Sequence, residues 1–142
     1  MTLAEIKAAI PHREPFLLID QIVERSERRI VCRKTFQASD YFYAGHYPHY
    51  PLTPGVLLCE AAMQAGAVLL SGLVSPGDAR VPVATRMNDV RFKRMVKPGE
   101  TIDIEVELQE RLADTFFLAA KVTLGGKLAV RFDFACTLAP TE

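Results

Sequence analysis

A histidine in a proline-bounded loop and a carboxylate in the apolar segment that follows are the residues of this sequence best suited to chemistry. Residues 45–64 read GHYPHYPLTPGVLLCEAAMQ and contain His46 and Glu60. A neutral imidazole accepts protons near pH 7, and nearby prolines restrict the loop that holds it. A carboxyl among apolar side chains resists ionisation and can donate its proton. We therefore predict a base at His46 and an acid at Glu60, although a surface histidine and a buried structural carboxylate are common alternatives.

The start of the expected helix offers a third chemical group, a pair of free backbone amides. Thr53 has the side chain of an N-cap residue, and Pro54 suits the first helical position. The N–H groups of Gly55 and Val56 would then have no partner inside the helix. With the helix dipole behind them, they would stabilise a carbonyl oxygen that gains negative charge. On these residues alone, an ordinary capped helix start is the more common explanation.

Gln64 follows Glu60 by one helical turn, so its amide can hydrogen-bond that carboxylate. The other two histidines, His12 and His49, are interpreted as surface residues. A base, an acid and oxyanion donors together indicate one reaction class. The base removes a proton next to a thioester carbonyl, and the acid protonates a β-hydroxyl that leaves as water.

The hydrophobic pattern predicts the elements that must position these groups. A short helix is expected over residues 2–10, ended by Pro11, and one long apolar helix begins at Pro54. Strands are predicted over residues 16–25, 28–37, 81–93, 101–110, 115–124 and 127–138. The long helix needs burial on nearly every side, which a curved, mostly antiparallel sheet wrapped around it provides. We therefore predict an α+β fold in a single domain, residues 1–142.

Composition argues against several classes of function. The 142 residues include 17 basic and 17 acidic side chains, so formal net charge gives no reason to expect nucleic acid or an anionic membrane as partner. Glu60 and Gln64 interrupt the longest apolar run, which favours a buried helix over a membrane span. Three cysteines without paired spacing, and no secretory pattern at the N-terminus, indicate a reduced, cytoplasmic protein.

Three segments resemble the FabZ-type 3-hydroxyacyl-(acyl carrier protein) dehydratases of bacterial type II fatty acid synthesis: residues 45–64, IPHREPFLLID upstream and DVRFKRMVKPGETIDIEVEL downstream. The resemblance runs from about Ile10 to Cys136. It implies a hotdog fold, in which subunits pair as homodimers that commonly assemble as trimers of dimers. It also implies dehydration of (3R)-hydroxyacyl thioesters to trans-2-enoyl thioesters. The substrate would be carried on the phosphopantetheine of acyl carrier protein, and no metal or dissociable cofactor would be needed.

The resemblance also implies roles for individual residues. His46 would be the catalytic base and Glu60 the acid, contributed to each site by opposite subunits. Gly55, Val56 and Gln64 are the expected substrate-binding residues: the Gly55 amide would polarise the thioester carbonyl, and the carbonyl of Val56 would hold the second imidazole nitrogen. The related dehydratase-isomerases carry aspartate where Glu60 stands, so double-bond isomerisation is not expected.

Several features leave alternatives open. Five residues depart from the family's usual ones, which bears on chain-length preference and on the entrance of the site: Glu14, Tyr47, His49, Thr53 and Met95. The cationic stretch RFKRMVK, residues 91–97, is either a landing surface for an acidic carrier protein or a solvated strand face. Two other functions remain: another hotdog enzyme (acyl thioesterase or enoyl-CoA hydratase), or a non-catalytic hotdog subunit that binds acyl thioesters.

Overall fold

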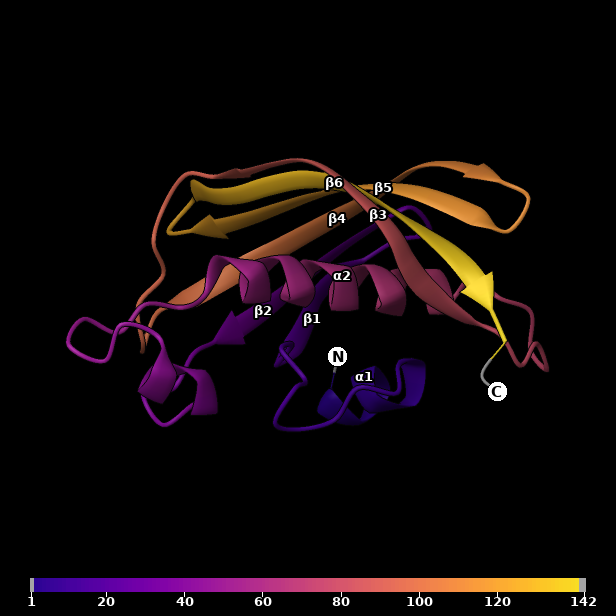
Figure 1. Ribbon diagram of the computed structural model, residues 1–142. Helices are drawn as coiled ribbons and strands as arrows, with labels where there is room; N and C mark the ends of the chain where they lie inside the picture. The colour runs from indigo at the N-terminus through magenta and orange to yellow at the C-terminus, as the bar shows by residue number, and fades with distance from the viewer. Residues whose placement is uncertain (1, 141–142) are drawn as a thin grey trace.

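The computed structural model describes residues 2–140 as one curved antiparallel sheet wrapped around a long helix (Figure 1). The elements in chain order are α1 (Leu3–Ala9), β1 (Gln21–Arg25), β2 (Arg29–Thr35), the 3-10 helix η1 (Tyr41–Gly45), α2 (Gly55–Ser71), β3 (Val81–Phe92), β4 (Thr101–Leu112), β5 (Thr115–Leu124) and β6 (Lys127–Ala139). This is the α+β hotdog fold predicted from the sequence.

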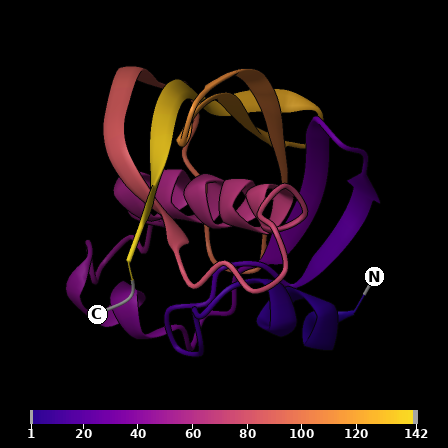
Figure 2. The ribbon, with the colours of Figure 1, turned by 90° about the vertical axis from the view of Figure 1, so that its right-hand side faces the viewer.

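The six strands follow the order β1-β2-β4-β5-β6-β3, and every pairing is antiparallel. In the view turned by 90°, the sheet arches over α2 (Figure 2). The period-two pattern of β4 turns one face inward, so that Ile102, Ile104 and Val106 are fully buried. Gly125 and Gly126 both adopt positive φ in the two-residue turn between β5 and β6, a conformation that glycine adopts without strain.

Helix α2 is covered by the sheet on one side and by the N-terminal segment on the other (Figure 1). Gly66 allows a close approach to the sheet, since a Cβ there would lie 2.7 Å from the ring of Phe134. Burial is not complete on every side. A stripe of partly or fully exposed residues runs along one face of the helix: Val56, Glu60, Met63 and Ala67. None of the helices within residues 2–140 is long and apolar enough to cross a membrane.

The structure differs from the predicted elements in two places. The strand expected from residue 16 begins only at Gln21, although Leu17, Leu18 and Ile19 are buried. Their burial comes from packing beneath α2, where the Leu18 N–H bonds a side chain and not a neighbouring strand. The short helix η1, just before the His46 loop, was not predicted, because five residues provide too little periodicity.

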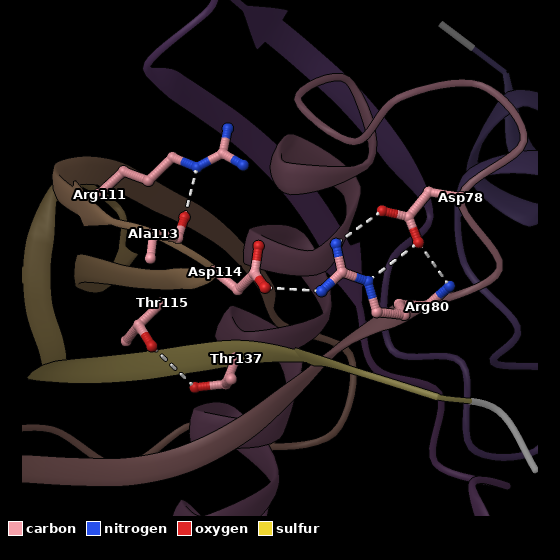
Figure 3. A network of polar contacts seen from close by, with 7 residues as sticks. All are labelled: Asp78, Arg80, Arg111, Ala113, Asp114, Thr115 and Thr137. Carbon is pink, nitrogen blue, oxygen red and sulfur yellow. Dashed lines mark hydrogen bonds and ion pairs between the residues drawn. The ribbon is translucent and has the colours of Figure 1, made fainter.

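An ion-pair network fixes the segment that leads into β3 (Figure 3). The guanidinium of Arg80 lies 3.0 Å from Asp78 and 2.6 Å from Asp114 in the turn between β4 and β5. Hydrogen bonds from Arg80 lower the pKa of the Asp78 carboxyl. The network therefore anchors the first residues of β3, which line one of the cavities described below.

Candidate active site

His46 is held in one orientation by a backbone carbonyl. It follows η1, and its Nδ1 lies 2.9 Å from the carbonyl oxygen of Leu52. A carbonyl only accepts hydrogen bonds, so Nδ1 carries the hydrogen and Nε2 keeps a free lone pair. The partner implied by the resemblance, the carbonyl of Val56, is wrong for this chain. The loop curls back far enough to present Leu52 instead, helped by the positive φ of Tyr47.

The helix start provides the two free amides, but not with the cap that the sequence predicts. Helix α2 begins at Gly55, and Pro54 occupies the N-cap position without a side-chain hydrogen bond. Thr53 is instead buried, where its hydroxyl lies 2.6 Å from that of Tyr43. The amides of Leu57 and Leu58 both bond the carbonyl of Pro54.

The amides of Gly55 and Val56 therefore lack a helical acceptor, as expected at a helix N-terminus. His46 and these amides share one cavity of about 560 Å³. Its walls come from the His46 loop, the start of α2 and the end of β3: His46, Tyr47, Leu52, Thr53, Gly55, Val56, Leu58, Phe92, Lys93, Arg94 and Met95. The imidazole of His46 and the start of α2 thus line the same cavity. Phe92 was missed by the sequence reasoning, because only the curvature of the sheet brings the end of β3 against α2.

Glu60 lies among the apolar side chains expected from the sequence and also beside two polar ones, those of Gln64 and His12. Its side chain is 23% exposed. One carboxylate oxygen, Oε2, accepts a hydrogen bond from the amide of Gln64 at 3.1 Å and lies 3.7 Å from Nε2 of His12. The hydrogen bond between Gln64 and Glu60 confirms the prediction from their helical spacing.

The side chain of Gln64 is buried and every part of its amide is engaged with the protein. Its oxygen accepts a hydrogen bond from the Leu18 amide at 2.8 Å, and its nitrogen donates to the Phe16 carbonyl at 2.8 Å as well as to Glu60. Backbone groups of the N-terminal segment therefore fix the orientation of the Gln64 amide, and this amide in turn orients the Glu60 carboxylate.

His12 was predicted to be a surface residue, and this is wrong. Its side chain is 28% exposed, faces Glu60, and has a buried Nδ1 without a hydrogen-bond partner. His49, in contrast, is exposed as expected. A signal for His12 exists in the sequence, because Pro11 and Pro15 bracket it much as prolines bracket His46.

A second cavity, of about 220 Å³, contains Glu60 and His12. Its remaining walls come from α2, the start of β3 and the end of β6: Met63, Ala67, Pro82, Val83, Ala84 and Cys136. Within a single chain, His46 and Glu60 thus line different cavities. Among the described residues, no three His, Cys, Asp or Glu side chains are grouped as they would be around a metal ion.

The cationic stretch at the end of β3 is divided among several environments. Arg91 pairs with Asp89 at 3.0 Å, and Lys97 stacks over the ring of Tyr50 at 5.2 Å. Lys93 and Arg94 line the His46 cavity. Two of the four cations therefore lie beside the predicted base.

Comparison with known proteins identifies the family. A model of the FabA-like domain matches residues 10–133. A 3-hydroxyacyl-(acyl carrier protein) dehydratase FabZ of Clostridium perfringens is 40% identical over 129 residues, covering 91% of this chain and 92% of the relative. A protein of the same name from Staphylococcus carnosus is 42% identical over 127 residues, covering 88% of this chain and 86% of the relative.

Solved structures share the fold at lower identity. The dehydratase heterocomplex ApeI:P from Xenorhabdus doucetiae matches with a TM-score of 0.79 at 17% identity, covering 96% of this chain and 91% of that one. An uncharacterised protein from Pyrococcus horikoshii matches with a TM-score of 0.66 at 16% identity, covering 89% of this chain and 87% of that one. Since the family model spans most of the sequence and close relatives match nearly its whole length, the chain belongs to the FabA-like family.

Proposed function

We propose that this protein dehydrates (3R)-hydroxyacyl thioesters carried on acyl carrier protein to trans-2-enoyl thioesters in fatty acid synthesis. The observation that carries the proposal is the fixed tautomer of His46, whose free Nε2 shares a cavity with the unpaired amides of Gly55 and Val56. A base beside an oxyanion-binding helix start suits removal of a proton next to a thioester carbonyl. The names of the relatives point to the same reaction.

In the proposed reaction, Nε2 of His46 takes a proton from the carbon next to the carbonyl. The resulting enolate oxygen accepts hydrogen bonds from the helix N-terminus, where the helix dipole adds positive potential. The enolate then collapses, the β carbon–oxygen bond breaks, and the hydroxyl leaves as water with a proton from Glu60. Elimination of water changes no overall oxidation state, so the proposed reaction requires no redox cofactor, and none of its steps calls for a metal.

We propose further that each complete site is shared between two subunits. His46 and Glu60 of one chain line different cavities. Strand β3 is a twelve-residue edge strand with exposed Val83 and Met87, and long unpaired edges are normally covered. A second subunit paired here would cover that edge and bring its Glu60 to the first subunit's His46. Three such dimers would form the hexamer implied by the resemblance.

Acyl carrier protein is the proposed partner because Lys93 and Arg94 lie at the His46 cavity. Cations there would attract an acidic carrier and the phosphate of its phosphopantetheine arm. The three cysteines are free and buried, which supports a location in the reducing cytoplasm.

The test is direct. Purified protein is incubated with a 3-hydroxyacyl group on acyl carrier protein, and separately with the coenzyme A thioester, while enoyl formation is followed. We expect turnover of the carrier-bound substrate. Release of free thiol and fatty acid without enoyl product would instead indicate a thioesterase, and binding without turnover would indicate a non-catalytic subunit.

A further inference from the structure

The two oxygens of the Glu60 carboxylate differ in their polar contacts, because the hydrogen bond from Gln64 and the contact with His12 both involve Oε2. Oε2 lies 3.1 Å from the amide nitrogen of Gln64 and 3.7 Å from Nε2 of His12. Within residues 2–140, no hydrogen bond reaches Oε1. The two oxygens are therefore suited to different tasks.

The orientation of the Gln64 amide determines the direction of its hydrogen bond to Oε2. Its oxygen faces the N–H of Leu18, which can only donate, and its nitrogen faces the carbonyl of Phe16, which can only accept. The remaining hydrogen on the nitrogen therefore points at Glu60. Oε2 is the acceptor in this contact, so the proton of the carboxylic acid is better placed on the other oxygen.

The surroundings of His12 decide where its hydrogen lies. Nδ1 is buried without a partner, and a hydrogen there would be a buried donor with nothing to bind. The hydrogen therefore belongs on Nε2, which faces Oε2. At 3.7 Å this contact is only about 0.5 Å too long for a normal hydrogen bond, and catalytic contacts often tighten when substrate binds.

Other charged groups near His12 are engaged elsewhere. The guanidinium of Arg13 donates hydrogen bonds to the carbonyls of Ile10, His12 and Lys7. Glu14 pairs with Lys7 at 2.9 Å. Burial raises the pKa of the Cys136 thiol, which also lines the cavity, to about 12, so that group stays neutral. His12 is thus the group placed to respond when Glu60 becomes charged.

We propose that His12 is a positioning residue for the acid: with Gln64 it holds Oε2, so that the departing proton resides on Oε1. The inference rests on the proposed dehydratase function. As the β carbon–oxygen bond breaks, its electron pair leaves with the oxygen, and the proton on Oε1 completes a water molecule. The negative charge left on the carboxylate is then shared with Oε2, where two N–H donors stabilise it.

The kinetic effect of losing the His12 contact follows from the negative charge that Glu60 gains during the reaction. Hydrogen bonds to an ionised acceptor are roughly twice as strong as those to a neutral one. The contact with His12 therefore stabilises the transition state more than the ground state. Its loss should lower kcat and leave KM nearly unchanged.

The variant His12→Phe separates this role from a structural one. A phenyl ring keeps the stacking on Phe16, where the ring centroids lie 6.3 Å apart, and removes both nitrogens, including the unpartnered one. We expect an equal or higher melting temperature, a kcat lowered by about 10- to 100-fold, the range of a hydrogen bond to a charged group, and a KM within a few-fold of wild type. His12→Gln returns an N–H donor and should recover part of kcat. His12→Leu is measured in parallel as a second variant without a donor.

The same substitution in a Glu60→Gln background provides the control. If His12 acts only through Glu60, adding His12→Phe to Glu60→Gln should cost no further activity. A folded His12→Phe protein with wild-type kcat, or additive losses in the double variant, would overturn the role of His12 while leaving the dehydratase function standing. Wild-type protein without turnover of either thioester would overturn the proposed function itself, and the inference with it.

Discussion

The ring of Phe92 lies against the backbone of Gly55 so closely that a Cβ at Gly55 would be 2.6 Å from the ring's Cε1 atom. Phe92 comes from the end of β3 and Gly55 from the first turn of α2. The contact places an aromatic wall beside the free amides of the helix start. A side chain at this position would therefore have to displace the ring, independently of any approach by a ligand.

We expect Gly55→Ala to damage activity more than stability. The Phe92 ring is 54% exposed and can move aside, but it would then shift within the cavity that holds His46. Displacements of about 1 Å in an active site can cost roughly 100-fold in rate. We predict a fall of at least 10-fold in kcat/KM with a small change in melting temperature.

Two further variants test the cause of that loss. Phe92→Leu should partly rescue Gly55→Ala, because the smaller side chain leaves room for the added methyl group. Gly45→Ala is the matched control, since a Cβ there meets nothing within 4 Å. Wild-type kcat/KM in Gly55→Ala would show that the contact has no influence on the site.

His46→Ala should abolish most of the activity. The variant removes the only atom proposed to accept the substrate proton, and loss of a general base typically costs about 100-fold or more. Dehydration is measured with the carrier-bound substrate, and circular dichroism checks the fold. Turnover within a few-fold of wild type in a folded variant would rule out His46 as the base.

Mixing two inactive variants tests whether sites are shared between subunits. His46→Ala and Glu60→Gln subunits are co-expressed or refolded together, and mass measurement confirms that they exchange. Hybrid dimers would contain one site with both wild-type groups, so activity should return toward about a quarter of wild type, the limit set by random symmetric pairing. No recovery after proven exchange would mean that His46 and Glu60 act within one chain, or that one of them is not catalytic.

The three thiols should be unreactive in the folded protein. Burial raises the pKa of Cys32 and Cys136 to about 12 and that of Cys59 to about 11. Almost no thiolate therefore exists at about pH 8. We expect no reaction with a thiol reagent such as DTNB under native conditions and three equivalents after denaturation. Fast labelling of the native state would show that the sheet opens readily.

The same thiols should make the free energy of unfolding fall as the pH rises in the alkaline range. In the unfolded chain they ionise from about pH 9, whereas in the folded chain they remain protonated. The unfolded state thus binds fewer protons as the pH rises above 9, and the free energy of unfolding falls. Thermal melts between about pH 8 and 10.5 measure the fall, and it should be smaller in Cys32→Ala than in the wild type.

Local patterns were sufficient to predict much of this protein. The alternation in β4 and the Gly-Gly turn before β6 predicted those strands closely, because side-chain periodicity and turn conformation depend on neighbouring residues. The hydrogen bond between Glu60 and Gln64 was predicted for the same reason, since helical spacing alone brings them together. His46, Glu60 and the helix start could be proposed as a chemical set because they occupy one continuous stretch.

Contacts between distant segments were decided only by the tertiary structure. Thr53 has the chemistry of an N-cap, yet its hydroxyl pairs with Tyr43, because burial makes that partner available. His12 faces Glu60, and Phe92 covers Gly55, because the sheet and the N-terminal segment close around α2. Such pairings depend on strand register, curvature and packing summed over the whole chain, and no local spacing encodes them. The sequence by itself therefore determined which groups are available for chemistry, whereas the tertiary structure decided which of them meet.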